Sequence, residues 1–211
     1  MRFDQFQISF PAWGPPNDCE MLRFFGDVSQ EYPQARFLHY NTDRGRRILK
    51  GKDYIKIAEV CPNLIATKSG GHSISTLLGL THTAPQLLHF VTELSYGAAG
   101  LLGLECGLLV SVSGINPAKS LEFFRAGCNG NLDTVRRLTF ELNSIRNKVM
   151  EIVTATGGHM DGAFDKMYAR LLDAEFPLAL KSPYQAPETT DFETFAEWLE
   201  TEFPDWFVGR T

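Results

Sequence analysis

The sequence lacks three patterns that often indicate a protein's function: paired cysteines, a long apolar run and an excess of basic residues. Its four cysteines show no CxxC spacing, so we predict neither a zinc ribbon nor a redox pair, and reduced thiols in the cytoplasm are the simplest interpretation. The net charge of −5 argues against a nucleic-acid partner. The longest apolar region, residues 98–112, is interrupted by Glu105 and by glycines and is too short to span a membrane, and no signal peptide is recognised after Met1.

Motifs for binding nucleotides and metals are missing as well. No predicted strand is followed by a GxGxxG or GxxxxGK(S/T) turn, so a nucleotide cofactor is not expected. No pair of histidines or carboxylates has metal-ligand spacing, and we predict no metal and no organic cofactor. The chain has 44% hydrophobic residues, enough for one substantial core, and small soluble molecules are its expected partners.

Short apolar runs alternate with helical stretches over residues 1–130. The predicted strands are 6–13, 36–41, 64–68, 87–92 and 107–113, and the predicted helices between and after them are 19–32, 53–60, 74–79, 95–102 and 117–126. Beyond residue 131 only helices are predicted, at 132–153, 162–172 and 192–203, the last capped by Thr190 or Asp191. This alternation predicts an α/β fold with a parallel sheet, either doubly wound or a barrel. We expect residues 1–130 to form part of a β/α barrel and residues 131–211 to form a helical extension.

Two reactive side chains end neighbouring predicted strands. Tyr40 ends the run 36–41 before Asn41, and Lys68 ends the run 64–68. Consecutive parallel strands lie about 4.8 Å apart, so a phenol and an amine at the same end of both strands can converge on one substrate. A desolvated lysine forms a Schiff base with a carbonyl compound, and a tyrosine can relay protons. Reactive groups at several strand ends favour the barrel, where chemistry occurs at that end.

Each of these residues also has a purely structural interpretation. A lysine at a strand end is commonly solvated, and a tyrosine there is commonly a core residue with its hydroxyl satisfied. His39 alternates with Tyr40, so we predict that it faces the helix layer as a packed, hydrogen-bonded histidine.

The polar residues near these strand ends leave two interpretations open. Arg44, Arg46 and Arg47 either recognise a substrate carboxylate or form a solvated basic loop. His72 follows two glycines and stands either on the rim of the site or exposed at the start of a helix.

In their combined order, these motifs resemble the dihydrodipicolinate synthase and N-acetylneuraminate lyase family, class I aldolases built on a (β/α)8 barrel with extra C-terminal helices. Tyr40-Asn41 is similar to the Tyr-Asn pair that ends the family's fifth strand, and Lys68 to the Schiff-base lysine that ends its sixth. The resemblance implies that Lys68 forms the imine and that Tyr40 relays protons. We also expect a homo-oligomer, either a dimer or a tetramer, because an incomplete barrel leaves strand edges unpaired. The resemblance also implies a set of substrate-binding residues: Asn41, Arg44, Arg46 and Val110, the last from the strand-like run 107–113.

The sequence also departs from the family's pattern. It begins at the counterpart of the family's fourth strand, and we therefore expect about five strand-helix units of the barrel. The Gly-Thr-Thr-Gly-Glu turn that binds the pyruvate carboxylate in the family has no counterpart, and the only Thr-Thr pair is Thr189-Thr190. Gly45 stands where lysine-pathway members carry an arginine, and Ala12-Trp13 replaces a tyrosine pair. These departures argue against lysine biosynthesis.

Two functional hypotheses follow. The first is an aldolase or lyase that acts through an imine at Lys68. It would make or break the carbon–carbon bond between an aldehyde and pyruvate, or another 2-oxo acid. The second is a non-catalytic relative with a binding or assembly role. In both cases five strands do not close a barrel, so we expect a partner chain or residues upstream of Met1 to cover the two edges.

Overall fold

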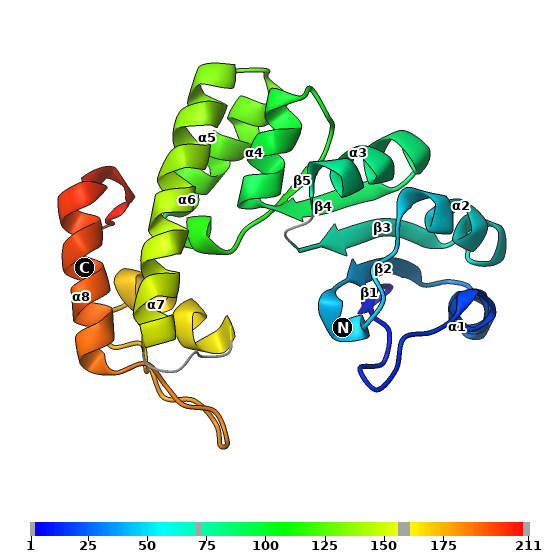
Figure 1. Cartoon of the computed structure of the whole chain (residues 1–211), viewed down its shortest axis with the longest axis horizontal. Coiled ribbons are helices and arrows are strands. Elements are labelled where there is room, and N and C mark those ends of the chain that lie inside the picture. Colours follow the sequence, from blue (N-terminus) through cyan, green and yellow to red (C-terminus); the bar gives the residue numbers. More distant parts are fainter. Residues whose placement is uncertain (1–2, 71–72, 156–160, 209–211) are drawn as a thin grey trace. The chain divides into compact units, whose positions relative to one another are not determined.

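The computed structural model describes residues 3–70, 73–155 and 161–208 (Figure 1). The chain forms two compact units, Met1–Leu109 and Val110–Thr211. All strands that the described residues form belong to the first unit. The expected boundary at residue 130 was placed after the last predicted strand-helix unit, whereas the boundary at Leu109 separates two compact parts of the chain. The boundary at residue 130 therefore stays a prediction.

Five parallel strands form the sheet of the first unit, in the order in which they occur in the chain. They are β1 (Gln5–Ile8), β2 (Arg36–Asn41), β3 (Leu64–Ser69), β4 (Leu88–Thr92) and β5 (Gly107–Leu109). They alternate with the helices α1 (Asp18–Glu31), α2 (Gly51–Val60), α3 (Ile74–Thr83) and α4 (Glu93–Leu101), and a short 3-10 turn, η1 (Asp43–Gly45), precedes α2. A doubly wound sheet reverses its strand order at a switch point, whereas neighbouring barrel strands are consecutive. The consecutive order confirms the predicted α/β fold with part of a β/α barrel.

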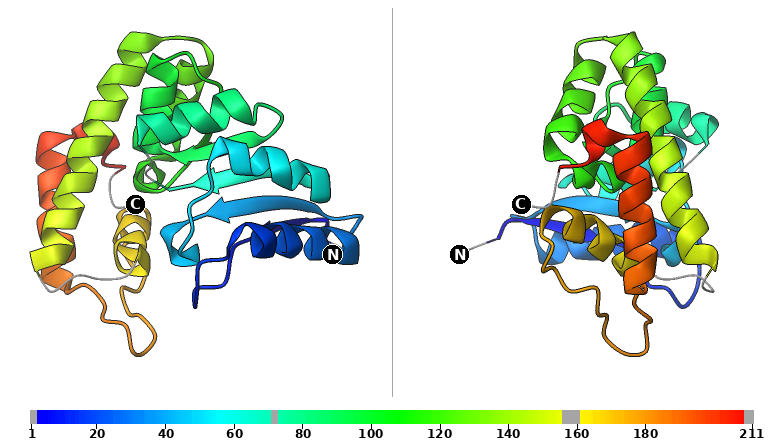
Figure 2. Two further views of the ribbon diagram at one scale, coloured as in Figure 1. Left: turned by 45° about the vertical axis from the view of Figure 1, so that its right-hand side comes forward. Right: turned by 90° about the vertical axis from the view of Figure 1, so that its left-hand side faces the viewer.

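The main core of this unit lies between the helices and one face of the sheet. Figure 2 shows the strands, coloured blue to green, lying side by side. Along β2 burial alternates, with Phe37, His39 and Asn41 buried and the residues between them half-buried. Side chains from α1, α2 and α3 pack on the buried set, among them Phe25 and Tyr54. The opposite face of β2 therefore carries Tyr40.

Helix α1 begins at Asp18, one residue before the predicted start at residue 19. The side chain of Asn17 accepts a hydrogen bond from the Glu20 amide at 3.0 Å, and the Glu20 carboxylate accepts one from the Asn17 amide at 2.8 Å. This capping box satisfies two of the amides that the first turn of a helix leaves without partners.

His39 faces the helix layer, as predicted. Its Nδ1 lies 2.8 Å from the hydroxyl of Tyr54, and its ring contacts the rings of Phe10 and Phe25 at centroid distances of 5.1 Å. Burial lowers the pKa of His39 to about 3, because the imidazolium form would lose its hydration. The histidine is therefore neutral and acts as a packed core residue.

Strand β5 is shorter than the sequence predicted. The strand ends at Leu109, and a 3-10 turn, η2 (Val112–Ile115), follows where residues up to 113 were expected to be extended. Ser111, Ser113 and Gly114 favour a turn, and this preference prevails over the β-propensity of the two valines in the segment. The predicted strand over 107–113 is wrong beyond Leu109.

The second unit consists of helices. They are α5 (Pro117–Cys128), α6 (Leu132–Ala155), α7 (Asp161–Leu172), α8 (Thr189–Glu202) and a 3-10 turn, η3 (Pro204–Trp206). The η3 turn is tied to α6 and α5: Trp206 Nε1 donates to Glu141 Oε2 of α6 at 2.7 Å, and the ammonium of Lys119 of α5 lies 3.6 Å from the Asp205 carboxylate. Trp206 is almost completely buried. The C-terminal turn is thus part of this unit's core.

The start of α8 corrects another expectation. Glu188, rather than Thr190 or Asp191, is the N-cap, and its amide donates to the Asp191 carboxylate at 3.0 Å.

Among the residues described, no helix combines the length and the apolar character that a membrane crossing requires.

Candidate active site

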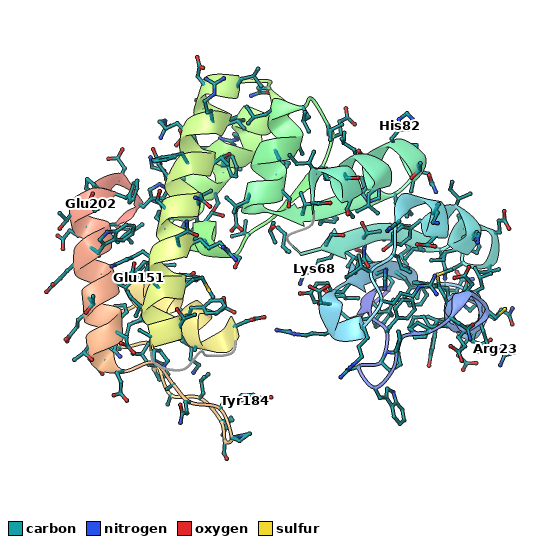
Figure 3. All side chains as sticks on the ribbon, viewed as in Figure 1. Arg23, Lys68, His82, Glu151, Tyr184 and Glu202 are labelled. Atoms are coloured by element: carbon teal, nitrogen blue, oxygen red, sulfur yellow. The ribbon has the colours of Figure 1, made fainter. Side chains whose placement is uncertain are left out.

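Tyr40 and Lys68 lie side by side on neighbouring strands. They are directly paired in the register of β2 and β3, and Lys68 Nζ lies 4.3 Å from the centroid of the Tyr40 ring. Figure 3 labels Lys68 near the carboxyl end of β3. Both side chains are half-buried. The structure thus brings together the two groups that the sequence selected, and an amine and a phenol at this distance can act on one bound molecule.

Behind Lys68, a buried polar bridge joins β3 to β4. The Thr67 hydroxyl lies 2.8 Å from His89 Nδ1, and His89 Nε2 lies 2.9 Å from the carbonyl oxygen of Ala84. A carbonyl only accepts, so Nε2 carries the hydrogen and Nδ1 accepts from the hydroxyl. Burial lowers the pKa of His89, which keeps the ring neutral in this arrangement. The bridge fixes the alignment of β3 with β4.

Sequence reasoning missed Thr67 and His89. The alternation that placed His39 opposite Tyr40 also places Thr67 opposite Lys68, and a polar residue on a buried face requires a partner. This need for a hydrogen-bond partner could have identified Thr67 from the sequence. Its partner becomes evident only from the pairing of Thr67 with His89 across the two strands.

Asn41 is completely buried and holds the loop that follows β2. Its Nδ2 donates to the carbonyl oxygen of Leu49 at 2.9 Å, and its Oδ1 accepts from the Leu49 amide at 2.8 Å. The side chain therefore closes the segment 42–48 into a loop with fixed ends. Its predicted contact with substrate stays a prediction.

The arginines after β2 bond to other parts of the first unit. Arg46 has a left-handed backbone with φ of 55°, which is uncommon for a residue with a side chain, and its Nε donates to the carbonyl oxygen of Ala12 at 2.6 Å. Arg47 donates to the carbonyl oxygen of Pro16 at 2.8 Å and to the Asp18 carboxylate at 2.7 Å. Arg46 and Arg47 thus tie the loop after β2 to the loop after β1.

The other expected site residues are placed as follows. Arg44 is exposed in the η1 turn. Gly45 is buried, and a Cβ there would lie 3.2 Å from the Cβ of Phe10, so a side chain such as the arginine of lysine-pathway members would require Phe10 to shift. Val110 is 49% exposed and belongs to the second compact unit. His72 lies outside the described residues.

No family model matches the sequence, and no curated protein matches it. Solved structures do match. A prophage protein of the dihydrodipicolinic acid synthase family from E. coli K12, solved in complex with pyruvate, has a TM-score of 0.78 at 16% sequence identity. The chain has the fold of this family. That match covers 94% of this chain and 66% of the prophage protein, so the chain spans less than two thirds of its neighbour's length.

Two further solved structures have a similar fold. Dihydrodipicolinate synthase from Bacteroides thetaiotaomicron matches with a TM-score of 0.76 at 16% identity, over 94% of this chain and 66% of that one. Ruminococcus gnavus sialic acid aldolase matches with a TM-score of 0.78 at 15% identity, over 97% of this chain and 67% of that one, and it has also been solved as a catalytic lysine mutant. The dihydrodipicolinate synthase fold thus includes both of the chain's compact units.

Replacing Asn41 by alanine should destabilise the protein. The change leaves the buried amide and carbonyl of Leu49 without partners, and each unsatisfied group costs about 1–3 kcal/mol, so a total loss of roughly 2–6 kcal/mol is expected. Urea unfolding followed by tryptophan fluorescence measures the loss. The exposed Asn129→Ala is the matched control, with an expected change within about 0.5 kcal/mol. Equal stability of the two variants would contradict the structural role of Asn41.

Proposed function

We propose that this chain acts as a Schiff-base aldolase or lyase on pyruvate or another 2-oxo acid, with an aldehyde as the second reactant. The observation that carries the proposal is the pairing of Tyr40 with Lys68, with the amine 4.3 Å from the centre of the phenol ring. The fold supports it, since one protein with this fold was solved with pyruvate and another has a catalytic lysine.

In the proposed reaction the unprotonated amine of Lys68 attacks the C2 carbonyl carbon of the 2-oxo acid. Loss of water from the carbinolamine gives the imine, and loss of a proton from C3 gives the enamine. The enamine carbon then bonds to the carbonyl carbon of the aldehyde, whose oxygen takes up a proton. Hydrolysis of the new imine releases the product and the amine. Tyr40 relays the protons in these steps, and no metal or organic cofactor takes part.

A second candidate function is binding or assembly without catalysis. One specific observation favours it: Asn41 and Arg46, both expected to bind substrate, bond to the backbone of this chain at Leu49 and Ala12. A family relative that has turned such groups to structural use would keep its fold without turnover. A folded protein that forms no imine at Lys68 would support this second function.

The first prediction of the proposed function is that Lys68 forms an imine with pyruvate. Incubation with pyruvate and cyanoborohydride, followed by peptide mass analysis, should show a reduced adduct on Lys68. The adduct should be lost in Lys68→Met and retained in Lys52→Met, which removes an exposed lysine of α2. A parent protein without an adduct on Lys68 would refute the proposed function.

The second prediction concerns Tyr40→Phe, which removes a hydroxyl and leaves the packing nearly unchanged. Exchange of the pyruvate methyl hydrogens for deuterium, followed by proton NMR, reports enamine formation without any knowledge of the aldehyde. We expect exchange to fall by about 10²- to 10⁴-fold while imine trapping persists, since general acid-base catalysis contributes on that order. The control is Tyr32→Phe, at an exposed tyrosine. Exchange at the parent rate in Tyr40→Phe would make Tyr40 structural.

The third prediction is that the protein associates, and we propose a homo-oligomer, either a dimer or a tetramer. Within the described residues, β1 pairs only with β2 and β5 only with β4, so each leaves an edge of the sheet unpaired. Leu88, which pairs with Ala66 in the register of β3 and β4, is 63% exposed. Covering such a surface takes an interface on the order of 2,000 Å².

Light scattering at micromolar concentration should report a dimer or a larger species. Leu88→Ser should weaken the association, whereas Ile55→Ser, at an exposed residue of α2, should not. A monodisperse monomer that unfolds cooperatively would rule out this association. The assignment to the cytoplasm stays a prediction.

A further inference from the structure

Phe90 and Gly107 continue the row that Tyr40 and Lys68 begin. In the register of the sheet, Lys68 pairs with Phe90 of β4, and Phe90 pairs with Gly107 of β5. Residues paired in this way lie at one level and on one face of a parallel sheet. The face opposite the helix layer therefore carries, across four strands, a phenol, an amine, a phenyl ring and a glycine.

The phenyl ring of Phe90 lies across β5. A Cβ at position 107 would lie 2.5 Å from Cδ1, 2.7 Å from Cε1 and 3.1 Å from Cγ of Phe90, which is closer than side-chain atoms pack. Only a glycine lets the ring occupy this place. On the other side of Phe90, the ammonium group of Lys68 lies over the ring of Tyr40. The side chains of Lys68 and Phe90 thus lean in opposite directions from adjacent strands.

A side chain at position 107 would force the ring of Phe90 to move. Side chains in strands occupy few staggered rotamers, and a phenyl ring that leaves β5 turns along β4 or toward β3. Lys68 is its neighbour on β3. The room beside the amine therefore depends on the missing Cβ of Gly107.

We propose that Phe90 is the specificity-determining wall beside Lys68 and that Gly107 is the positioning residue that keeps this wall away from the amine. The substrate class rests on the proposed function: the wall admits 2-oxo acids with a small C3 substituent, such as pyruvate, and excludes those branched at C3. An apolar ring suits the C3 methyl group, and a wall of fixed position discriminates by size, with one methylene worth about 10- to 200-fold in a hydrophobic pocket.

The test measures how readily Lys68 is labelled by small and by branched carbonyl compounds in the presence of cyanoborohydride. One pair is pyruvate and 3-methyl-2-oxobutanoate, and the other is formaldehyde and isobutyraldehyde. In Phe90→Ala the ratio of branched to small labelling should rise about tenfold or more for both pairs. In Gly107→Ala labelling by all four compounds should fall about tenfold, because the displaced ring crowds the amine.

The double variant Phe90→Ala/Gly107→Ala should return labelling to the level of Phe90→Ala, since no ring is left to displace. A general loss of structure at position 107 would not be rescued in this way. Gly79→Ala is the matched control, since a Cβ at this helical glycine meets no atom within 4 Å beyond its chain neighbours and the backbone of its own helix. Circular dichroism and thermal melting verify the fold of each variant, and the Phe90→Ala ratio decides the matter if Gly107→Ala does not fold.

Failure of the inference and failure of the proposed function give different results. The aldehydes label an accessible amine without any enzymatic chemistry. A parent that takes the aldehydes on Lys68 but not pyruvate would refute the proposed function. An unchanged aldehyde ratio in Phe90→Ala, or a double variant as poorly labelled as Gly107→Ala, would overturn the role of Phe90 and Gly107.

Discussion

The register of the three strands β2, β3 and β4 is the constraint on which the candidate site depends. It places Tyr40, Lys68 and Phe90 at one level of one face. A slip of one residue would turn Lys68 into the helix layer and bring Thr67 to the reactive face, because side chains alternate along a strand. The Thr67–His89–Ala84 bridge opposes this slip, since it satisfies buried polar groups only in the observed alignment.

The polar residues on the two faces of the sheet differ in what they contact. On the helix side His39, Thr67 and His89 are buried and bond to groups of the protein itself. Both histidines have lowered pKa values because burial disfavours their charged forms, so neither ring is suited to exchange protons with a substrate at neutral pH. In the proposed reaction, acid-base chemistry therefore falls to Tyr40 and Lys68, on the opposite face.

The positions of individual strands could be predicted well from the sequence, whereas the contacts between residues on neighbouring strands could not. Strands β2 and β3 were found to within one residue because each is a short buried run that ends in a polar group before a turn. Strand β5 was extended too far because Val110 and Val112 have strand propensity, while the serines and Gly114 between and after them form a turn. The partner of Thr67 and the direction of the Phe90 ring depend on which residues face each other across strands, and a single sequence does not display that register.

The position of the reactive row within the sheet separates two requirements of the proposed reaction. Tyr40 and Lys68 lie on β2 and β3, and each of these strands has a neighbour on both sides. The amine and the phenol are therefore held by internal strands, whatever pairs with the edges of β1 and β5. Binding of the substrate's carboxylate is a different matter, because Arg46 and Arg47 already hold the loop after β1. Imine trapping thus tests Lys68 and its neighbours on the internal strands. The strength of 2-oxo acid binding instead tests the groups around them that would hold the carboxylate.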